Sequence, residues 1–233
     1  WRFYKYIWEE RKNYDKVFVH MNQEYVLLAG DMWRLMGKKV YMWRNHAKGD
    51  ILTMMAVWIA HKVFYTSPQS FTVKFRKSVR MPVGIDTNFF KPDPSVVRES
   101  NSILFLGRIA PVKKVLEFVE WLKTQDFDSC TIAGSALAKD LDYEKKVKDR
   151  VVELELSDQV KFVGSVNQIE ARRLYQTHET YVNFTPVGSL DKTIFEAKAC
   201  GAKVEVKNSD YEKLSNEDHG LKSLLDKFMV EIK

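Results

Sequence analysis

The sequence has few residues that stabilise or anchor a chain from outside a folded core. Its only cysteines, Cys130 and Cys200, stand among apolar or small residues, so a disulfide framework is excluded and a reducing cytoplasm is favoured. The longest apolar run, residues 51–60, holds nine apolar residues and one threonine, well short of the roughly 20 that span a membrane. There is also no low-complexity tract, short repeat or metal-ligand spacing. We therefore expect a globular cytoplasmic protein with a core of its own.

A regular alternation of strand and helix patterns runs through the whole sequence. In the first part, apolar strands are expected at residues 16–20, 39–43 and 62–66, with helices between them and a further helix at 70–77. In the second part, strands are expected at residues 102–107, 129–133, 160–163, 181–184 and 202–206, again separated by amphipathic helices. This order predicts parallel sheets with helices on both faces. Pro, Gly and Asn interrupt it near residues 82–92, and we expect two domains, 1–86 and 87–233.

Charge is distributed unevenly between these two parts. Residues 1–80 hold 15 Lys and Arg against 6 Asp and Glu, a net charge of +9, whereas the remaining residues carry −3. A basic first part suits nucleic acid, an anionic membrane surface or an anionic substrate, and equally a solvated surface without a partner. No recognition motif accompanies the charge, so nucleic-acid binding is not expected. Contact of residues 1–80 with an anionic membrane surface stays as a hypothesis.

Residues 181–201 combine a strand, a loop of small residues and the start of a helix. Such a helix N-terminus favours anions, because its N–H groups and its dipole point toward the loop. Glu196 falls just over one turn into the helix, where a carboxylate can accept two hydrogen bonds from a diol. An ordinary α/β crossover with Glu196 as a solvated surface acid is the alternative interpretation.

This stretch resembles the donor-binding signature of glycosyltransferase family 4, in which two Glu residues are separated by seven others. Residues 196–201, Glu-Ala-Lys-Ala-Cys-Gly, are similar to the second Glu and its tail. The first Glu falls at Gly188, so backbone N–H groups and the Ser189 hydroxyl are expected to act there instead. The resemblance implies that the donor diphosphate and sugar contact six consecutive residues: Gly188, Ser189, Leu190, Asp191, Lys192 and Thr193.

A second motif, residues 107–114, follows the first strand of the second part. Ligands bind at the carboxyl ends of strands in open α/β sheets. Arg108 can bind a phosphate with two parallel N–H groups, and Lys113 can add a positive point charge to the same diphosphate. A basic loop that caps a helix is the alternative interpretation. The loop is similar to the family 4 segment whose Arg and Lys hold the nucleotide diphosphate, with Lys114 in place of the usual Gly. The resemblance also implies that Ser165 and Val166 contact the nucleotide base.

In the first part, residues 37–46 resemble the strand that ends in an active-site His in many family members. The resemblance implies that His46 contacts the transferred sugar or the reacting centre, although a His at a strand end is often structural. His20 ends the neighbouring strand in a similar way and ranks lower.

The resemblance as a whole implies two Rossmann-like domains in a GT-B arrangement. Family members begin with further strands, so the first domain is expected to be incomplete and its strand at residues 16–20 to present an edge. A second copy of this chain, upstream sequence or the aromatic residues 1–8 are expected to cover that edge.

The implied activity is transfer of a sugar from a nucleotide-diphosphate sugar to the hydroxyl of a glycan or lipid-linked acceptor. Arg108, Lys113 and the helix N-terminus are expected to stabilise the departing diphosphate, and Glu196 to hold donor hydroxyls. The resemblance implies retention of configuration, no metal or other cofactor, and work in polysaccharide biosynthesis in the cytoplasm or at the inner face of the membrane. A non-catalytic subunit that binds a nucleotide-sugar or a glycan is the alternative.

Overall fold

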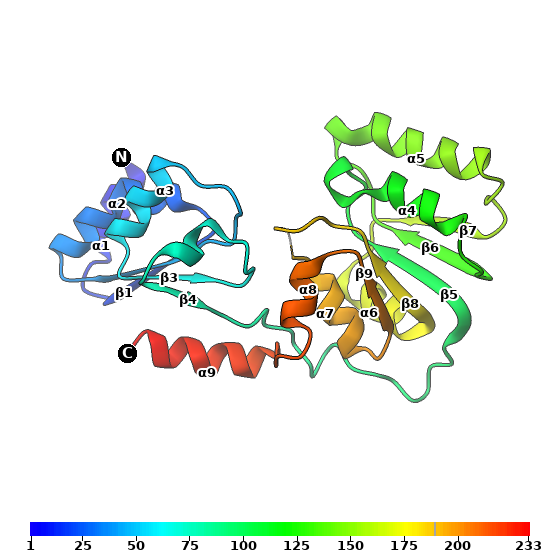
Figure 1. Cartoon of the computed structure of the whole chain (residues 1–233). Helices are drawn as coiled ribbons and strands as arrows, with labels where there is room; N and C mark the ends of the chain where they lie inside the picture. Colours follow the sequence, from blue (N-terminus) through cyan, green and yellow to red (C-terminus); the bar gives the residue numbers. More distant parts are fainter. Residues whose placement is uncertain (189) are drawn as a thin grey trace. The chain divides into compact units, whose positions relative to one another are not determined.

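The computed structural model describes residues 1–188 and 190–233. The chain forms two compact units, Trp1–Met81 and Pro82–Lys233, and each consists of one parallel sheet with helices (Figure 1). The expected α/β fold class is thereby confirmed. The second unit begins five residues before the expected boundary at 86/87. Ile85 accounts for this difference, because its side chain is buried in the core of the second unit.

The first unit contains a four-stranded sheet in the order β1-β2-β3-β4, with every pair parallel. Its strands are β1 (Lys16–His20), β2 (Lys39–Trp43), β3 (Lys62–Tyr65) and β4 (Ser78–Arg80). Its helices are α1 (Arg2–Glu9), α2 (Gln23–Leu35) and α3 (Ile51–Ile59), with a single 3₁₀ turn, η1 (Phe71–Lys74). The three α-helices share one apolar core with the sheet.

A capping box explains where α3 begins, and the helix expected at residues 70–77 is reduced to the turn η1. The Asp50 carboxylate accepts the Thr53 N–H at 2.8 Å, and the Asp50 N–H donates to the Thr53 hydroxyl at 3.3 Å, so a capping box starts α3. The helix expected at residues 70–77 is wrong beyond one turn, because Phe75 turns to an extended conformation and leads into β4.

Within the described residues, β1 pairs with β2 alone and therefore forms one edge of the sheet, as expected. The aromatic segment before β1 forms α1 and packs on α2. Phe3 contacts the rings of Tyr25 and Trp33, and the Tyr4 hydroxyl donates to the Leu28 carbonyl at 3.0 Å. Pairing of the β1 edge with a second copy of the chain stays a prediction.

The second unit contains a five-stranded parallel sheet in the order β7-β6-β5-β8-β9. Its strands are β5 (Glu99–Leu106), β6 (Ser129–Ala133), β7 (Val160–Gly164), β8 (His178–Asn183) and β9 (Lys203–Val206). Its helices are α4 (Val115–Leu122), α5 (Leu141–Glu153), α6 (Gln168–Thr177), α7 (Lys192–Ala199), α8 (Ser209–Leu214) and α9 (Leu221–Glu231), with 3₁₀ turns η2 (Pro111–Lys113) and η3 (Ala138–Asp140).

Alternating side chains of β5 bury both faces of this sheet. Ile103 and Phe105 join a core with α4 and α5, whereas Leu104 joins a second core with α6 and α7. Figure 1 shows these helix pairs on opposite faces of the sheet. This double covering explains the nearly continuous apolar strand at residues 103–106 and leaves the strand ends as the open part of the sheet.

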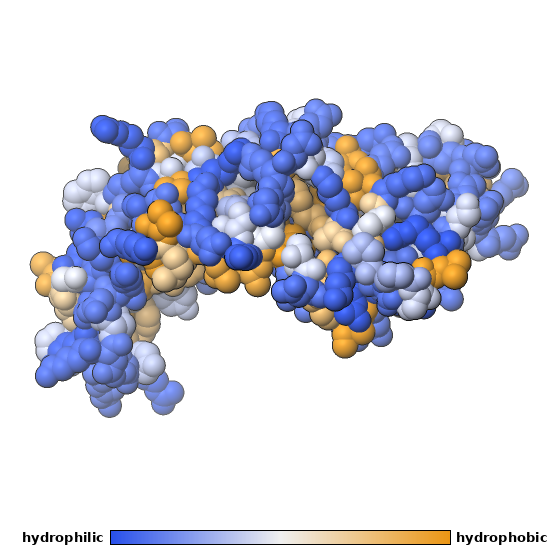
Figure 2. Space-filling view, turned by 90° about the horizontal axis from the view of Figure 1, so that it is seen from below, coloured by the Kyte–Doolittle hydropathy of each residue, from blue (hydrophilic) through white to orange (hydrophobic). Residues whose placement is uncertain are grey.

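The face of the chain shown in Figure 2 is mostly hydrophilic. On the face shown in Figure 2, apolar side chains gather in several separate areas among hydrophilic ones. In the described part of the chain, no helix has the length and apolar character needed to cross a lipid bilayer.

Candidate functional site

The candidate site lies at the carboxyl ends of β5, β6, β7 and β8, which are neighbours in the sheet of the second unit. The first three ends are joined directly through the backbone. The Gly107 N–H donates to the Ala133 carbonyl at 2.9 Å, and the Gly134 N–H donates to the Gly164 carbonyl at 2.7 Å. Sequence segments that are about 30 residues apart therefore meet at one edge.

Gly134 allows the loop after β6 to lie close to the backbone of Gly107. Its φ is +140°, and a Cβ atom built there would lie 1.9 Å from the carbonyl oxygen of Gly107. Only a residue without a side chain fits, because both neighbouring groups are backbone. Gly134 therefore fixes the position of the loop that begins with Arg108.

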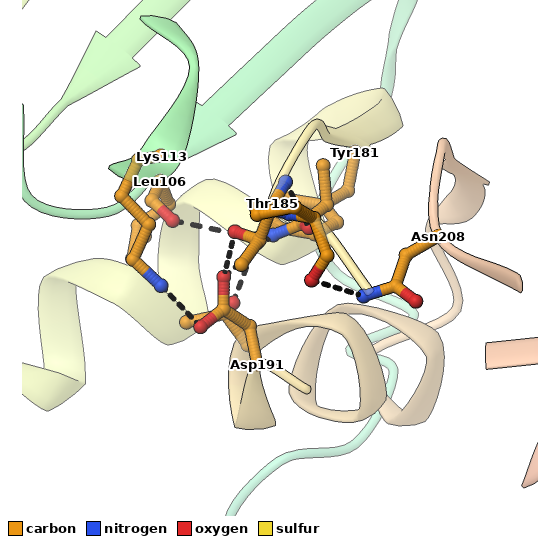
Figure 3. A network of polar contacts seen from close by, with 9 residues as sticks. Leu106, Lys113, Tyr181, Thr185, Asp191 and Asn208 are labelled. Carbon is orange, nitrogen blue, oxygen red and sulfur yellow. Dashed lines mark hydrogen bonds and ion pairs between the residues drawn. The ribbon is translucent and has the colours of Figure 1, made fainter. Parts of the chain in front are cut away.

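The two cations expected to bind a diphosphate both lie on the loop after β5, in different surroundings. Arg108 is exposed, and within the described residues its guanidinium has no hydrogen bond or ion pair. Lys113 instead contacts the carboxylate of Asp191, with both side chains largely buried at 17% and 18% exposure (Figure 3). Asp191 was expected at the site, but its ion pair with Lys113 was not.

Asp191 is also held by polar groups from the end of β8. The Asn183 amide donates to Asp191 Oδ2 at 3.0 Å, and the Thr185 hydroxyl donates to the same oxygen. The Tyr181 hydroxyl donates to Thr193 Oγ1 at 2.7 Å, on the first turn of α7. Figure 3 shows this network between the loop after β5 and the start of α7.

Glu196 lies one turn into α7 and is buried, with 8% of its surface exposed. The Tyr175 hydroxyl donates to Oε2 at 3.3 Å, and the Lys192 ammonium lies 3.8 Å from Oε1. Burial raises the pKa of this carboxyl above its ordinary value of 4.5, and the ammonium of Lys192 opposes that shift. Glu196 is therefore not a solvated surface acid.

The loop between β8 and α7 is fastened by α8, an element that the sequence did not predict. The Gly188 N–H donates to Asp210 Oδ2 at 2.9 Å, and the Asn208 amide donates to the Pro186 carbonyl at 3.0 Å. Gly188 has a φ of +90°. Leu190 packs against the core shared with α6 and α7, whereas the expected contact at Ser189 lies outside the described residues.

The model of the family described as glycosyl transferases group 1 matches residues 86–209, which is more than half of the chain. The chain belongs to this family. Its site residues in the second unit, from Arg108 to Glu196, all fall within the matched segment. A search of curated protein sequences finds no match.

Solved structures similar to this glycosyltransferase-family chain share little sequence with it. HepE from Anabaena in complex with UDP is 17% identical, with a TM-score of 0.77, over 98% of this chain and 71% of that one. The same protein with UDP-glucose gives a TM-score of 0.73 at 17% identity, covering 99% and 72%. A glycosyltransferase from Rickettsia africae gives 0.71 at 18% identity, covering 98% and 69%. These similarities confirm the expected GT-B fold class.

The remaining expected residues of this family member lie in two places. Ser165 follows β7, and its hydroxyl is 2.5 Å from that of Ser135 after β6, while Val166 packs against the core shared with α6 and α7. His46 belongs to the first unit, where it follows β2, is exposed and accepts the Lys48 N–H on Nδ1 at 3.0 Å. Among the described side chains, no group of three or more His, Cys, Asp or Glu is placed to hold a metal ion.

Several residues that contact the candidate site of this glycosyltransferase-family chain were not expected from its sequence. Tyr175 and Asp210 reach the site from α6 and α8, 21 and 22 residues away from the groups they contact. No local pattern indicates such contacts. Asp191 offered one available signal, because a carboxylate at a helix N-cap commonly faces N–H groups or a cation.

Proposed function

We propose that this chain binds a nucleotide-diphosphate sugar and transfers the sugar to the hydroxyl of a glycan or lipid-linked acceptor, with retention of configuration. The observation that carries the proposal is the meeting of Arg108, Lys113 and the start of α7 at the ends of neighbouring strands, with Glu196 buried one turn away. Complexes of HepE with UDP and UDP-glucose support a donor of this class. The likeness to family 4 supports retention.

The proposed mechanism depends on charge stabilisation by the protein. Negative charge collects on the diphosphate as the bond to the sugar breaks, and fixed cations and dipoles lower the energy of that state. Arg108 binds the diphosphate with its planar fork, Lys113 adds a point charge, and the first N–H groups of α7 add their dipoles. No metal ion enters this proposal. Glu196 accepts hydrogen bonds from donor hydroxyls. Contact of His46 with the transferred sugar stays a prediction.

A panel of nucleoside diphosphates and their sugars tests the proposal directly. In calorimetry, the full chain is expected to bind the nucleoside diphosphate of one base saturably and more tightly than the others, through base contacts that include Ser165 and Val166. Release of the nucleoside diphosphate in the presence of an acceptor then reports transfer. Absence of binding to every member of the panel would contradict the proposed function.

The first variant to compare is Arg108→Ala. A charge-assisted contact is worth roughly 1.5–3 kcal/mol, so the affinity for the selected nucleoside diphosphate is expected to fall about tenfold or more. Arg108 is exposed, and the free energy of unfolding should therefore stay close to that of the wild type. Lys222→Ala removes an exposed cation from α9 and serves as the matched control. Equal affinities for all three proteins would exclude Arg108 from the site.

A non-catalytic subunit that binds a nucleotide-sugar is the second candidate function. Gly188 stands where family 4 has the first Glu of its pattern, and Lys113 is paired with Asp191. Both features weaken the catalytic proposal without removing donor binding. Saturable binding of the donor with no transfer or hydrolysis in the full-length protein would favour this second function.

We extend the proposal to contact with an anionic membrane surface, which would give access to a lipid-linked acceptor. The outward side of α3 is apolar and exposed, most of all at Ile51 (70%) and Trp58 (77%), while Ala56 and Val57 on its other side are buried in the core. Residues 51–80 contain five Lys and Arg and no Asp or Glu. An apolar helix face beside cations suits a surface of anionic lipids.

Vesicle co-sedimentation checks this contact. The chain is expected to bind vesicles that contain anionic lipid and to bind neutral vesicles much more weakly, because residues 1–80 carry a net charge of +9. Trp58→Ser is expected to reduce binding several-fold by removing the most exposed aromatic side chain of α3. Leu35→Ser removes an exposed apolar side chain from the end of α2 and should bind like the wild type. Equal binding to neutral and anionic vesicles would contradict the proposal.

A further inference from the structure

The surroundings of the Asp191 carboxylate are those of a bound anion. Three groups approach it: the Lys113 ammonium, the Asn183 amide at 3.0 Å and the Thr185 hydroxyl. Cations, amide N–H groups and hydroxyls are also the groups with which proteins hold phosphate oxygens. Figure 3 shows the carboxylate between the loop that carries Lys113 and the segment that carries Thr185.

The position of Asp191 on its helix gives the same indication independently. Asp191 is the N-cap residue of α7, yet its side chain forms no capping hydrogen bond to that helix. The carboxylate is turned toward Lys113 instead, so its oxygens accept no hydrogen bond from the first N–H groups of α7. Because the helix dipole favours negative charge at this end, a carboxylate here takes advantage of the same field that would attract a phosphate.

This arrangement has a cost for the proposed reaction. Lys113 is one of two cations assigned to the diphosphate, and its charge is already balanced by Asp191 at a contact where both side chains are largely buried. A phosphate that approaches Lys113 therefore meets a carboxylate of the same sign. Two anions that share one cation at short range repel each other more strongly in such a site than in water.

We propose that Asp191 is an internal anion that occupies Lys113 in place of the diphosphate of the donor, and that donor binding requires Lys113 to separate from it. Asp191 is thus a determinant of donor affinity in this chain, and it opposes binding. This inference rests on the proposed function, because it concerns the same site. It explains why Asp191, an anion, lies beside Lys113 at a site proposed to bind a diphosphate.

The test measures the affinity of the full chain for UDP, ADP, GDP and inorganic pyrophosphate by calorimetry. Asp191→Asn keeps the size of the side chain and its hydrogen bonding to Asn183 and Thr185 while removing the charge. Affinity for the preferred diphosphate and for pyrophosphate is expected to rise about tenfold. The same change in a Lys113→Ala background should give no such rise, because the gain depends on release of Lys113. Asp226→Asn, on the exposed side of α9, controls for the loss of one negative charge.

A second variant keeps the test decisive if Asp191→Asn proves unstable. Thr185→Val removes one hydrogen bond that holds the Asp191 carboxylate in place without changing its charge. Lys113 should then separate from Asp191 more easily, and a smaller rise in diphosphate affinity is expected. Unchanged or weaker diphosphate binding by folded Asp191→Asn would overturn the inference, since Asp191 would then position Lys113 for the ligand. That result leaves the proposed function standing if Arg108→Ala still weakens binding. Failure of the wild type and of both variants to bind any probe would overturn both proposals.

Discussion

Gly134→Ala is expected to lower the free energy of unfolding of the second unit by roughly 3–5 kcal/mol, from backbone strain and overpacking together. The added Cβ would lie 1.9 Å from the carbonyl oxygen of Gly107, and an alanine would also have to adopt a φ of +140°. Movement of Gly134 would break its hydrogen bond to the Gly164 carbonyl, and movement of Gly107 would break its hydrogen bond to the Ala133 carbonyl. Denaturant unfolding of the full chain measures the loss, and calorimetry should show weaker diphosphate binding because Arg108 directly follows Gly107.

Two neighbouring glycines separate the causes of this effect. Gly164 has a φ of +72° but nothing within 4 Å of its built Cβ, so Gly164→Ala should cost only the strain of a left-handed residue, about 1–2 kcal/mol. Gly107 would place a Cβ 3.7 Å from the ring of Phe105, an ordinary contact, and Gly107→Ala should be tolerated best. Equal stabilities of the Gly134 and Gly164 variants would show that the close approach to Gly107 is not rigid.

The fold was predictable from sequence because its main signals are local. Each strand of the two sheets except β4 overlaps a strand expected from its local residue pattern, and α3 begins at a capping box that involves only Asp50 and Thr53. The misses occurred where such signals are weak. β4 and α8 are short and carry little apolar periodicity. The strand expected at residues 181–184 begins earlier, at His178, because β8 pairs with Glu99 of β5 and β5 itself extends beyond its apolar part.

The candidate site was predictable as a list of residues but not as a set of partners. Parallel strands place their carboxyl ends at one edge, so Arg108, Ser165 and the start of α7 could be assigned to one edge without a structure. The pairing of Lys113 with Asp191 could not, because 78 residues separate them and neither has a local partner in the sequence. Burial of Glu196 also depends on α6, which supplies Tyr175. Long-range side-chain contacts of this kind leave no periodic trace.

Glu196→Gln is expected to weaken donor binding about tenfold, because a hydrogen bond to a charged group contributes roughly 1.5–3 kcal/mol and one between neutral groups about 0.5–1.5 kcal/mol. Gln keeps an oxygen for the Tyr175 hydroxyl and nearly the same volume, so the helix and its packing should be preserved. Calorimetry with the preferred nucleotide-sugar measures the loss. Glu212→Gln, an exposed residue in the first turn of α8, is the matched control and should leave affinity unchanged.

The same substitution should increase stability at neutral pH, and this gain distinguishes a binding role from a structural one. The folded pKa of Glu196 is raised above its ordinary value of 4.5 by burial. Between the unfolded and folded pKa values the folded state therefore binds more protons, and stability falls as pH rises through that window. Gln removes this loss, so the variant should exceed the wild type in free energy of unfolding at pH 7. Below pH 4.5 the difference should shrink, because Glu196 is then protonated in both states. A variant that is less stable than the wild type at pH 7 and binds donor normally would show that Glu196 serves the fold and not the donor.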